Sequence, residues 1–170
     1  MKNTKKVSLK IVLASDHAGF ERKNELLEFL KKETFDVEDV GAHTLDQGDD
    51  YPKYMVGAAM RVVEDPDNTR AIIFGMSGQG EAIVVNRFPG VRAAVWYGGS
   101  LDIIKLSREH NDANVLSLGG RLLTGGQAEE VLRTWLATPF AGGRHAARVR
   151  KITEIERRYK TWTQPNSKNS

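Results

Sequence analysis

The chain has no cysteine among its 170 residues. Disulfide bonds, cysteine-ligated zinc and thiolate catalysis are therefore all excluded. Long apolar runs are also missing, because none approaches the roughly 20 residues that a membrane span requires. The N-terminus starts with charged residues and then reads as a first strand, which is not the pattern of a signal peptide. We therefore expect a cytoplasmic protein that contacts no membrane.

The chain has little excess of either charge, since 25 Lys and Arg residues stand against 22 Asp and Glu residues and the net charge is only +3. Its distribution is uneven, because the segment from Arg144 onward carries eight Lys or Arg residues against two Glu residues. A basic segment can contact nucleic acid, but no aromatic interleaving or recognition motif accompanies this one. We expect it to bind a small anion and not nucleic acid.

Strand-like and helix-like patterns alternate along the chain. They predict strands over 7–14, 35–40, 71–74, 91–95 and 115–118, and helices over 20–32, 53–63, 81–86, 100–110, 127–135 and 143–160. Alternation with short links predicts a parallel sheet covered on both faces. The expected fold is a single α/β domain with three α/β/α layers and a doubly wound, Rossmann-like, five-stranded sheet. We expect the domain to span 1–160 and residues 161–170 to form a disordered tail.

In such a sheet, ligands bind at the carboxyl ends of the strands. The most informative segment there is GMSGQGE, residues 75–81. It is not a P-loop, because Glu81 and Ala82 replace the lysine and the hydroxyl residue. It also lacks the third glycine of a dinucleotide fingerprint, and Gln79 breaks the nucleophile-elbow pattern.

What remains at this segment is a strand-to-helix turn whose backbone amides can stabilise an oxyanion. Glu81 stands beside these amides and can take a proton from carbon. The alternative is that Glu81 only complements the dipole of the helix that it starts. This segment alone does not separate the two interpretations.

Further polar residues accompany the other strands. Asp16 and His17 follow the first strand, and the pair His110–Asn111 precedes the fifth. Arg144 and Arg148 lie four residues apart on the last helix, so they share a face and can clamp a phosphate. Each residue also has a structural interpretation as a turn, a helix end or a surface charge.

Taken together, the motifs resemble those of the type B ribose-5-phosphate isomerases, a family that includes galactose- and allose-6-phosphate isomerase subunits. The resemblance covers about residues 9–155. Its motifs occur here in family order as SDHAG, DYP, SGQGE, REHNDANVL, GGR and GGRHAARV. The family has a cysteine-base branch and a glutamate-base branch. Gly75 stands at the cysteine position and Glu81 at the glutamate position, so the chain is similar to the glutamate branch.

The resemblance implies a role for each motif residue. The catalytic residues would be Glu81, Ser77, Asp16 and His110. The substrate-binding residues would be His17, Gly78, Gly80, Asn111, Arg121, Arg144 and Arg148. Tyr51 is expected to line the sugar pocket, and His145 is given no role. The family also implies a homodimer or homotetramer with shared active sites, and no metal or other cofactor.

The implied reaction is aldose–ketose isomerisation, with ribose 5-phosphate and ribulose 5-phosphate as the leading pair. One alternative is a tetrose or hexose phosphate, of the allose or galactose 6-phosphate type. A second alternative is a non-catalytic module that binds a sugar phosphate. Two departures bear on the sugar: Met76 replaces a residue that is usually glycine, and Val84–Val85 replaces two alanines.

Overall fold

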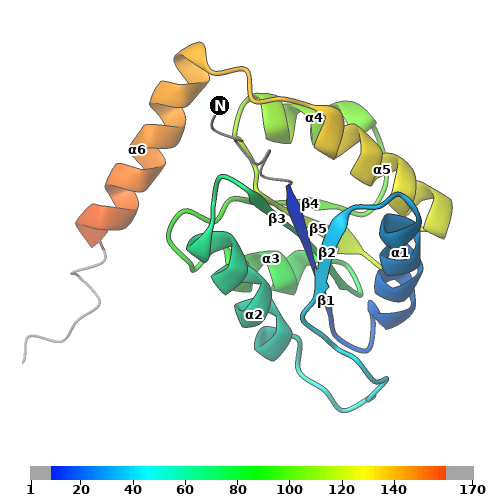
Figure 1. The fold of residues 1–170 in the computed structure, drawn as a ribbon. Helices are drawn as coiled ribbons and strands as arrows, with labels where there is room; N and C mark the ends of the chain where they lie inside the picture. The colour runs from blue at the N-terminus through cyan, green and yellow to red at the C-terminus, as the bar shows by residue number, and fades with distance from the viewer. Residues whose placement is uncertain (1–8, 160–170) are drawn as a thin grey trace, which may run out of the picture.

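The computed structural model describes residues 9–159, in which strands and helices alternate as expected (Figure 1). The strands are β1 (Lys10–Ser15), β2 (Asp36–Asp39), β3 (Thr69–Gly75), β4 (Ala93–Trp96) and β5 (Val115–Gly119). The helices are α1 (Phe20–Lys32), α2 (Tyr51–Glu64), α3 (Gln79–Val85), α4 (Leu101–Glu109), α5 (Gly125–Ala137) and α6 (Gly143–Tyr159). The expected tail, 161–170, lies outside the described residues, as do the first residues of the expected 7–14 strand.

All strand pairs are parallel, and the order across the five-stranded sheet is β2-β1-β3-β5-β4. This order confirms the predicted doubly wound α/β sheet. Side chains alternate between its two faces because the side-chain period of a strand is two. Ile11 and Leu13 point into a core with α1, α4 and α5, whereas Val12 and Ala14 point into a second core with α2 and α3.

The predicted boundaries differ from the observed ones at several ends. Helix α5 begins two residues before the predicted start, because Thr124 and Gln127 form a reciprocal capping box. Strand β4 begins at Ala93 and not at 91, because the Val91 N–H is bonded to the Phe88 carbonyl in a turn. Within residues 9–159, no helix is both long and apolar enough to cross a bilayer.

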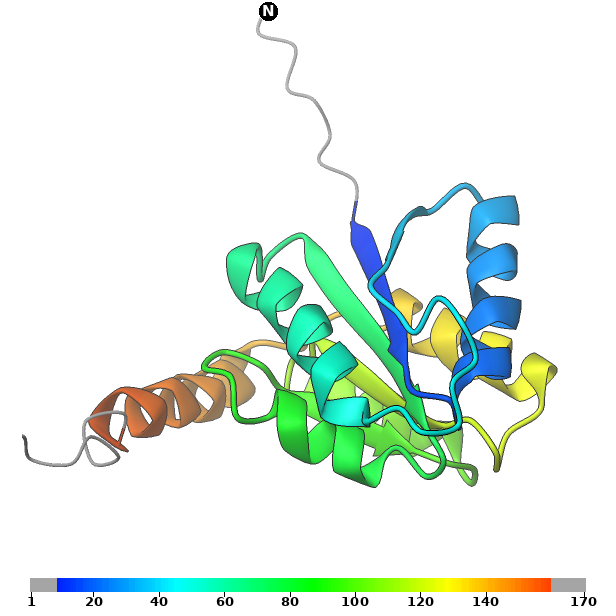
Figure 2. The same ribbon diagram turned by 90° about the horizontal axis from the view of Figure 1, so that it is seen from below.

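Helix α6 stands apart from the layers and projects from one side of the domain (Figures 1 and 2). His145 is its one buried residue, whereas Ile152, Ile155 and Tyr159 are 40%, 56% and 48% exposed. These three side chains recur at helical spacing and form an apolar stripe. An apolar stripe of this kind is typical of a helix that packs against another surface.

Candidate active site

Three loops meet at the carboxyl edge of the sheet. They follow β1 (residues 16–19), β3 (residues 76–78) and β5 (residues 120–121). The Gly120 N–H donates to the Gly75 carbonyl over 2.7 Å, which joins the third loop to the end of β3, where the second loop begins. A Cβ atom at Gly19 would lie 2.4 Å from the Phe74 Cβ, so only glycine lets the first loop approach this closely. The close approach brings the motifs after β1, β3 and β5 together.

The glycine loop turns sharply from β3 into α3. Gly78 has φ +79°, in the left-handed region that favours glycine. The Ser117 hydroxyl of β5 donates to the Gly78 carbonyl over 2.6 Å and holds the turn in place. The Ser77 hydroxyl accepts a hydrogen bond from the Gln79 N–H at 3.4 Å. The loop therefore presents Ser77 and the first amides of α3 at the edge of the sheet, as oxyanion stabilisation requires.

Glu81 lies in the first turn of α3 and is 5% exposed. A Cβ atom built on Gly75 would lie 1.8 Å from the Glu81 Oε1 and 2.0 Å from its carboxyl carbon. The carboxylate thus occupies the space beside the backbone where any other residue at position 75 would place its side chain. Gly75 is required for this placement of Glu81 even though its φ lies outside the left-handed region.

Burial raises the pKa of Glu81 above the usual carboxyl value, and the charge of Asp16 raises it further. The backbone hydrogen bond at the start of α3 acts in the opposite direction, but burial outweighs it. The sequence could not decide between these two effects. A carboxylate with a raised pKa is a stronger base, which suits proton abstraction from carbon near neutral pH.

Asp16 has both a structural contact and a position facing the site. Its Oδ1 accepts the N–H groups of Ala18 and Gly19 at 3.0 and 3.1 Å, which is the turn role that the sequence allowed. Its Oδ2 lies 3.9 Å from the His17 Nδ1.

Tyr51 borders the same region, because a Cβ atom at Gly80 would lie 2.9 Å from its ring. The tyrosine therefore packs directly beside the glycine loop.

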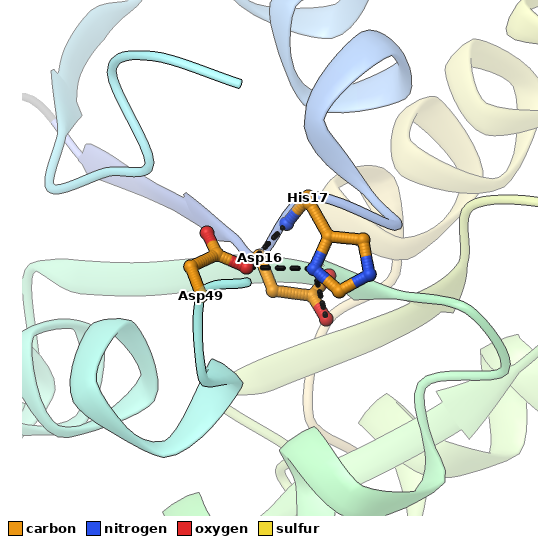
Figure 3. Close-up of side chains that lie close together, drawn as sticks. All are labelled: Asp16, His17 and Asp49. Atoms are coloured by element: carbon orange, nitrogen blue, oxygen red, sulfur yellow. Dashed lines mark hydrogen bonds and ion pairs between the residues drawn. The ribbon is translucent and has the colours of Figure 1, made fainter. Parts of the chain in front are cut away.

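His17 is paired with Asp49, a residue for which the sequence suggested no role (Figure 3). The Asp49 Oδ1 lies 2.7 Å from the His17 Nδ1 and also accepts the His17 backbone N–H at 3.0 Å. The hydrogen bond to Asp49 raises the pKa of His17 above its ordinary value. Burial acts to raise the pKa of Asp49, but the hydrogen bonds from His17 and Tyr54, together with the charge of His17, outweigh it and leave that pKa lowered. His17 is thus held as a cation over a wider pH range.

Asp16, His17 and Asp49 each offer a possible metal ligand, and these atoms lie within 4.8 Å of one another. The sequence showed no metal-ligand spacing, because Asp49 is 32 residues away from His17. The His17 Nδ1 and the Asp49 Oδ1 already bind each other, and the Asp16 Oδ1 binds two backbone amides. These contacts favour a hydrogen-bonded network over a metal site.

A cavity of about 380 Å³ opens next to this network. Its lining includes His17 from the first loop and Arg121 from the third, and the remaining residues are Ala18, Glu21, Arg22, Leu45, Gln47 and Gly120. His17, Arg22 and Arg121 bring three basic side chains to one cavity, although Arg22 is already paired with Glu25. Basic side chains gathered in this way provide a site for an anionic group. Glu21 introduces a negative charge at its border, which the motif analysis did not consider.

The remaining candidate residues form a second group at the other side of the sheet, where the strands begin. His110 ends α4, and Asn111 precedes β5, which starts at Val115. A parallel strand of five residues separates its two ends by roughly 15 Å. The residues after the strands and those before β5 are therefore kept apart within one chain.

The second group also contains the start of α6. The ring of His145 stacks on that of His110, with centroids 4.1 Å apart and planes 6° apart. Arg144 donates from Nε to the His145 Nε2 at 3.4 Å, and Arg148 lies near enough to influence the pKa of His145. The structure thus divides the predicted site residues into two groups, one at the carboxyl ends of the strands and one at their amino ends.

One group contains Asp16, His17, Tyr51, Ser77, Gly78, Gly80, Glu81 and Arg121. The other contains His110, Asn111, Arg144 and Arg148. Sequence reasoning missed Asp49 and His145 as their neighbours. Asp49 directly precedes the DYP motif, and His145 lies inside the last motif. Their positions at the motifs were the one sequence signal that could have marked them as site residues. Neither contact could be inferred from that adjacency.

An open parallel α/β sheet with a glycine turn and a buried carboxylate at its carboxyl edge is typical of an enzyme that acts on a small anionic substrate. Comparison with known proteins narrows this class. The family model described as Ribose/Galactose Isomerase matches residues 11–152. The chain therefore belongs to the ribose/galactose isomerase family.

Individual relatives agree with this assignment. Ribose-5-phosphate isomerase B of Mycolicibacterium paratuberculosis is 38% identical over 150 residues, covering 88% of this chain and 92% of the relative. A solved structure of ribose-5-phosphate isomerase B from Clostridium thermocellum superposes with a TM-score of 0.83 at 42% identity, covering 89% of this chain and 99% of that one. The Mycoplasma genitalium enzyme with bound ribulose 5-phosphate gives 0.84 at 34% identity, covering 89% and 98%.

Proposed function

We propose that the protein interconverts ribose 5-phosphate and ribulose 5-phosphate through an enediolate, with Glu81 as the base. The observation that carries the proposal is the placement of the Glu81 carboxylate. It is buried, its pKa is raised, and it fills the space left by Gly75 beside the glycine turn. A glutamate that only complemented a helix dipole could do so from the surface, because charge–dipole interactions at helix ends do not require burial.

The proposed reaction begins with opening of the furanose ring. A proton leaves the C1 hydroxyl, another reaches the ring oxygen, the bond between C1 and that oxygen breaks, and the C1 aldehyde forms. His110 and Asp16 are the groups assigned to these proton transfers. Glu81 then takes the proton from C2, and the electron pair moves to the C1 oxygen to give the enediolate.

Ser77, Asn111 and the amides around Gly78 and Gly80 stabilise the negative oxygen. A proton moves from the C2 oxygen to the C1 oxygen. Glu81 returns its proton to C1, and the ketone forms at C2. The base ends in its starting state, so the reaction needs no external oxidant or reductant.

The phosphate group is assigned to the cationic side chains of the site. His17 and Arg121 line the same cavity, and the hydrogen bond to Asp49 raises the pKa of His17 and so favours its charged form. Arg144 and Arg148 supply further guanidinium groups, whose planar forks suit the oxygens of a phosphate. Tyr51 forms one wall beside the sugar.

A complete site requires a second copy of the chain. Glu81 and His110 lie at opposite edges of one sheet, so one chain alone does not bring them together. The apolar stripe on α6 (Ile152, Ile155 and Tyr159) offers a surface for self-association, since it is exposed on a projecting helix (Figure 1). We infer a homodimer in which the His110–Asn111 segment and α6 of one subunit complete the site around Glu81 of the other.

The direct test is conversion of ribose 5-phosphate, followed by the absorbance of the ketose, with tetrose and hexose phosphates in parallel. Glu81→Gln keeps the shape of the side chain but removes the base, so kcat should fall by at least ~10²–10⁴ while binding changes little. Glu130→Gln, on the exposed part of α5, is the matched control and should keep full activity. Binding of ribose 5-phosphate without any conversion would instead support the non-catalytic module.

The same set of sugar phosphates also shows which sugar the protein prefers as its substrate. Faster conversion of a hexose or tetrose phosphate than of ribose 5-phosphate would contradict the proposed substrate but keep the reaction type. If Glu81→Gln kept more than a tenth of the wild-type kcat, Glu81 would not be the base.

A further inference from the structure

His145 is a buried histidine on a helix that is otherwise exposed. It lies near the start of α6, with one residue between it and the pair Gly142–Gly143, whose φ angles are both positive. It is only 8% exposed. Neither the reaction steps nor the phosphate contacts described above use it, so its burial needs another explanation.

The contacts of His145 are those of a packing partner and not of a hydrogen-bonding group. Its Nδ1 is buried and has no hydrogen-bond partner among residues 9–159. Its Nε2 only accepts a long bond from the Arg144 Nε at 3.4 Å. Its closest ring contact is the stack on His110, which is almost parallel at 6° and 4.1 Å. The ring therefore contributes mainly a flat surface against His110.

The backbone around His110 is held by a separate set of contacts. Arg92 donates to the carbonyls of Asn111 and Asp112 at 2.9 and 2.8 Å and to the Asp112 carboxylate at 3.0 Å. Arg108 donates to the same carboxylate at 2.8 Å. These bonds keep Asp112 in the left-handed region at φ +47°. With the backbone held in this way, the main freedom left to His110 is rotation of its side chain, which the stack opposes.

We propose that His145 is a positioning residue that fixes the ring plane of His110 for the sugar ring-opening step. The inference rests on the proposed function, because it requires His110 to act in ring opening. A group that transfers protons must be held within a narrow range of positions, and a displacement of about 1 Å can cost ~10²-fold in rate.

The charge state of His145 agrees with this role. Burial lowers its pKa, and the nearby His110, Arg144 and Arg148 lower it further. His145 is therefore neutral near neutral pH. A neutral ring can stay stacked on His110 while His110 gains and loses a proton, whereas a second cation at this distance would repel it.

Two measurements separate ring opening from proton transfer at carbon. The first is net conversion of ribose 5-phosphate, which exists mainly as a closed furanose and needs ring opening. The second is incorporation of solvent deuterium at C1 of ribulose 5-phosphate, followed by NMR. Ribulose 5-phosphate has an open chain, because phosphate blocks its C5 hydroxyl, so this exchange needs Glu81 but no ring opening.

The informative variants are His145→Ala, which removes the stack, and His145→Phe, which keeps a flat ring. Since the His145 Nδ1 has no partner, phenylalanine loses no hydrogen bond there. We expect His145→Ala to lower net conversion by about 10–100-fold. The rate of deuterium exchange should stay within about threefold of the wild-type rate, because the residue acts on the ring-opening step and not on proton transfer at carbon. His145→Phe should restore most of the lost conversion. His43→Ala, at a histidine with a 69% exposed side chain, is the control for a histidine substitution as such.

Three results would overturn the inference. They are full conversion by His145→Ala, an equal loss of conversion and exchange in that variant, and no recovery in His145→Phe. Preserved exchange in His145→Ala also shows that the variant is folded and binds substrate. Failure of the proposed function looks different, because wild-type protein would then neither convert ribose 5-phosphate nor exchange deuterium.

Discussion

Replacement of Gly75 by alanine tests whether the space beside β3 places the carboxylate of Glu81, the proposed base. The added Cβ would lie 1.8 Å from the Glu81 Oε1, whereas ordinary contact begins at 3.4 Å. The obstructing atoms belong to the end of a flexible side chain, so the carboxylate can rotate away while the backbone stays in place. We therefore expect a folded protein in which the base is displaced.

The size of the effect follows from that displacement. The carboxylate must move by about 1.6 Å, and a misplacement of about 1 Å in a catalytic group can cost ~10²-fold. We expect kcat for ribose 5-phosphate to fall by at least ~10²-fold, with little change in KM, because the proposed phosphate contacts are assigned to other residues. The assay is steady-state isomerisation, together with thermal unfolding of the variant.

Gly126→Ala is the matched control. Gly126 lies in the first turn of α5, its φ lies outside the left-handed region, and its added Cβ would have no atom within 4 Å. It should keep wild-type kcat and gain slightly in stability, by up to about 1 kcal/mol. Wild-type kcat in Gly75→Ala would refute the argument, since the carboxylate could then work without that space.

Three further predictions concern the shared site and the phosphate. Co-expression of Glu81→Gln with His110→Ala should yield about a quarter of wild-type activity, because half of the dimers are mixed and each mixed dimer has one intact site; mixed dimers without activity would place both residues in one subunit's site. Arg144→Ala should raise KM by roughly 10–150-fold, since a lost charge-assisted bond costs about 1.5–3 kcal/mol, and an equal loss for the dephosphorylated sugar would contradict phosphate recognition. The raised pKa of His17 keeps its charge above pH 6.5, so KM should rise as pH passes through that pKa. In Asp49→Asn the rise should begin at lower pH, and an unchanged KM profile would show that Asp49 does not hold the charge of His17.

The sequence alone determined the class of fold. The alternation of strand-like and helix-like periods requires a parallel sheet with crossover helices, and the observed order β2-β1-β3-β5-β4 agrees with it. It also placed Asp16, Glu81 and Arg121 at one edge, because each follows a strand and the carboxyl ends of parallel strands lie together. Boundaries were less accurate, as at Thr124, because a capping box extends a helix beyond its apolar pattern.

Only the tertiary structure decided the environment of each group. Whether the pKa of Glu81 is raised or lowered depends on the balance of burial against the start of α3, and burial depends on how the loops pack. The pairing of His17 with Asp49 joins residues 32 positions apart, and the stack of His145 on His110 joins residues from α6 and the end of α4. Local patterns report the periodicity and backbone preferences of a segment, but contacts between distant segments arise only when the sheet and its helices pack.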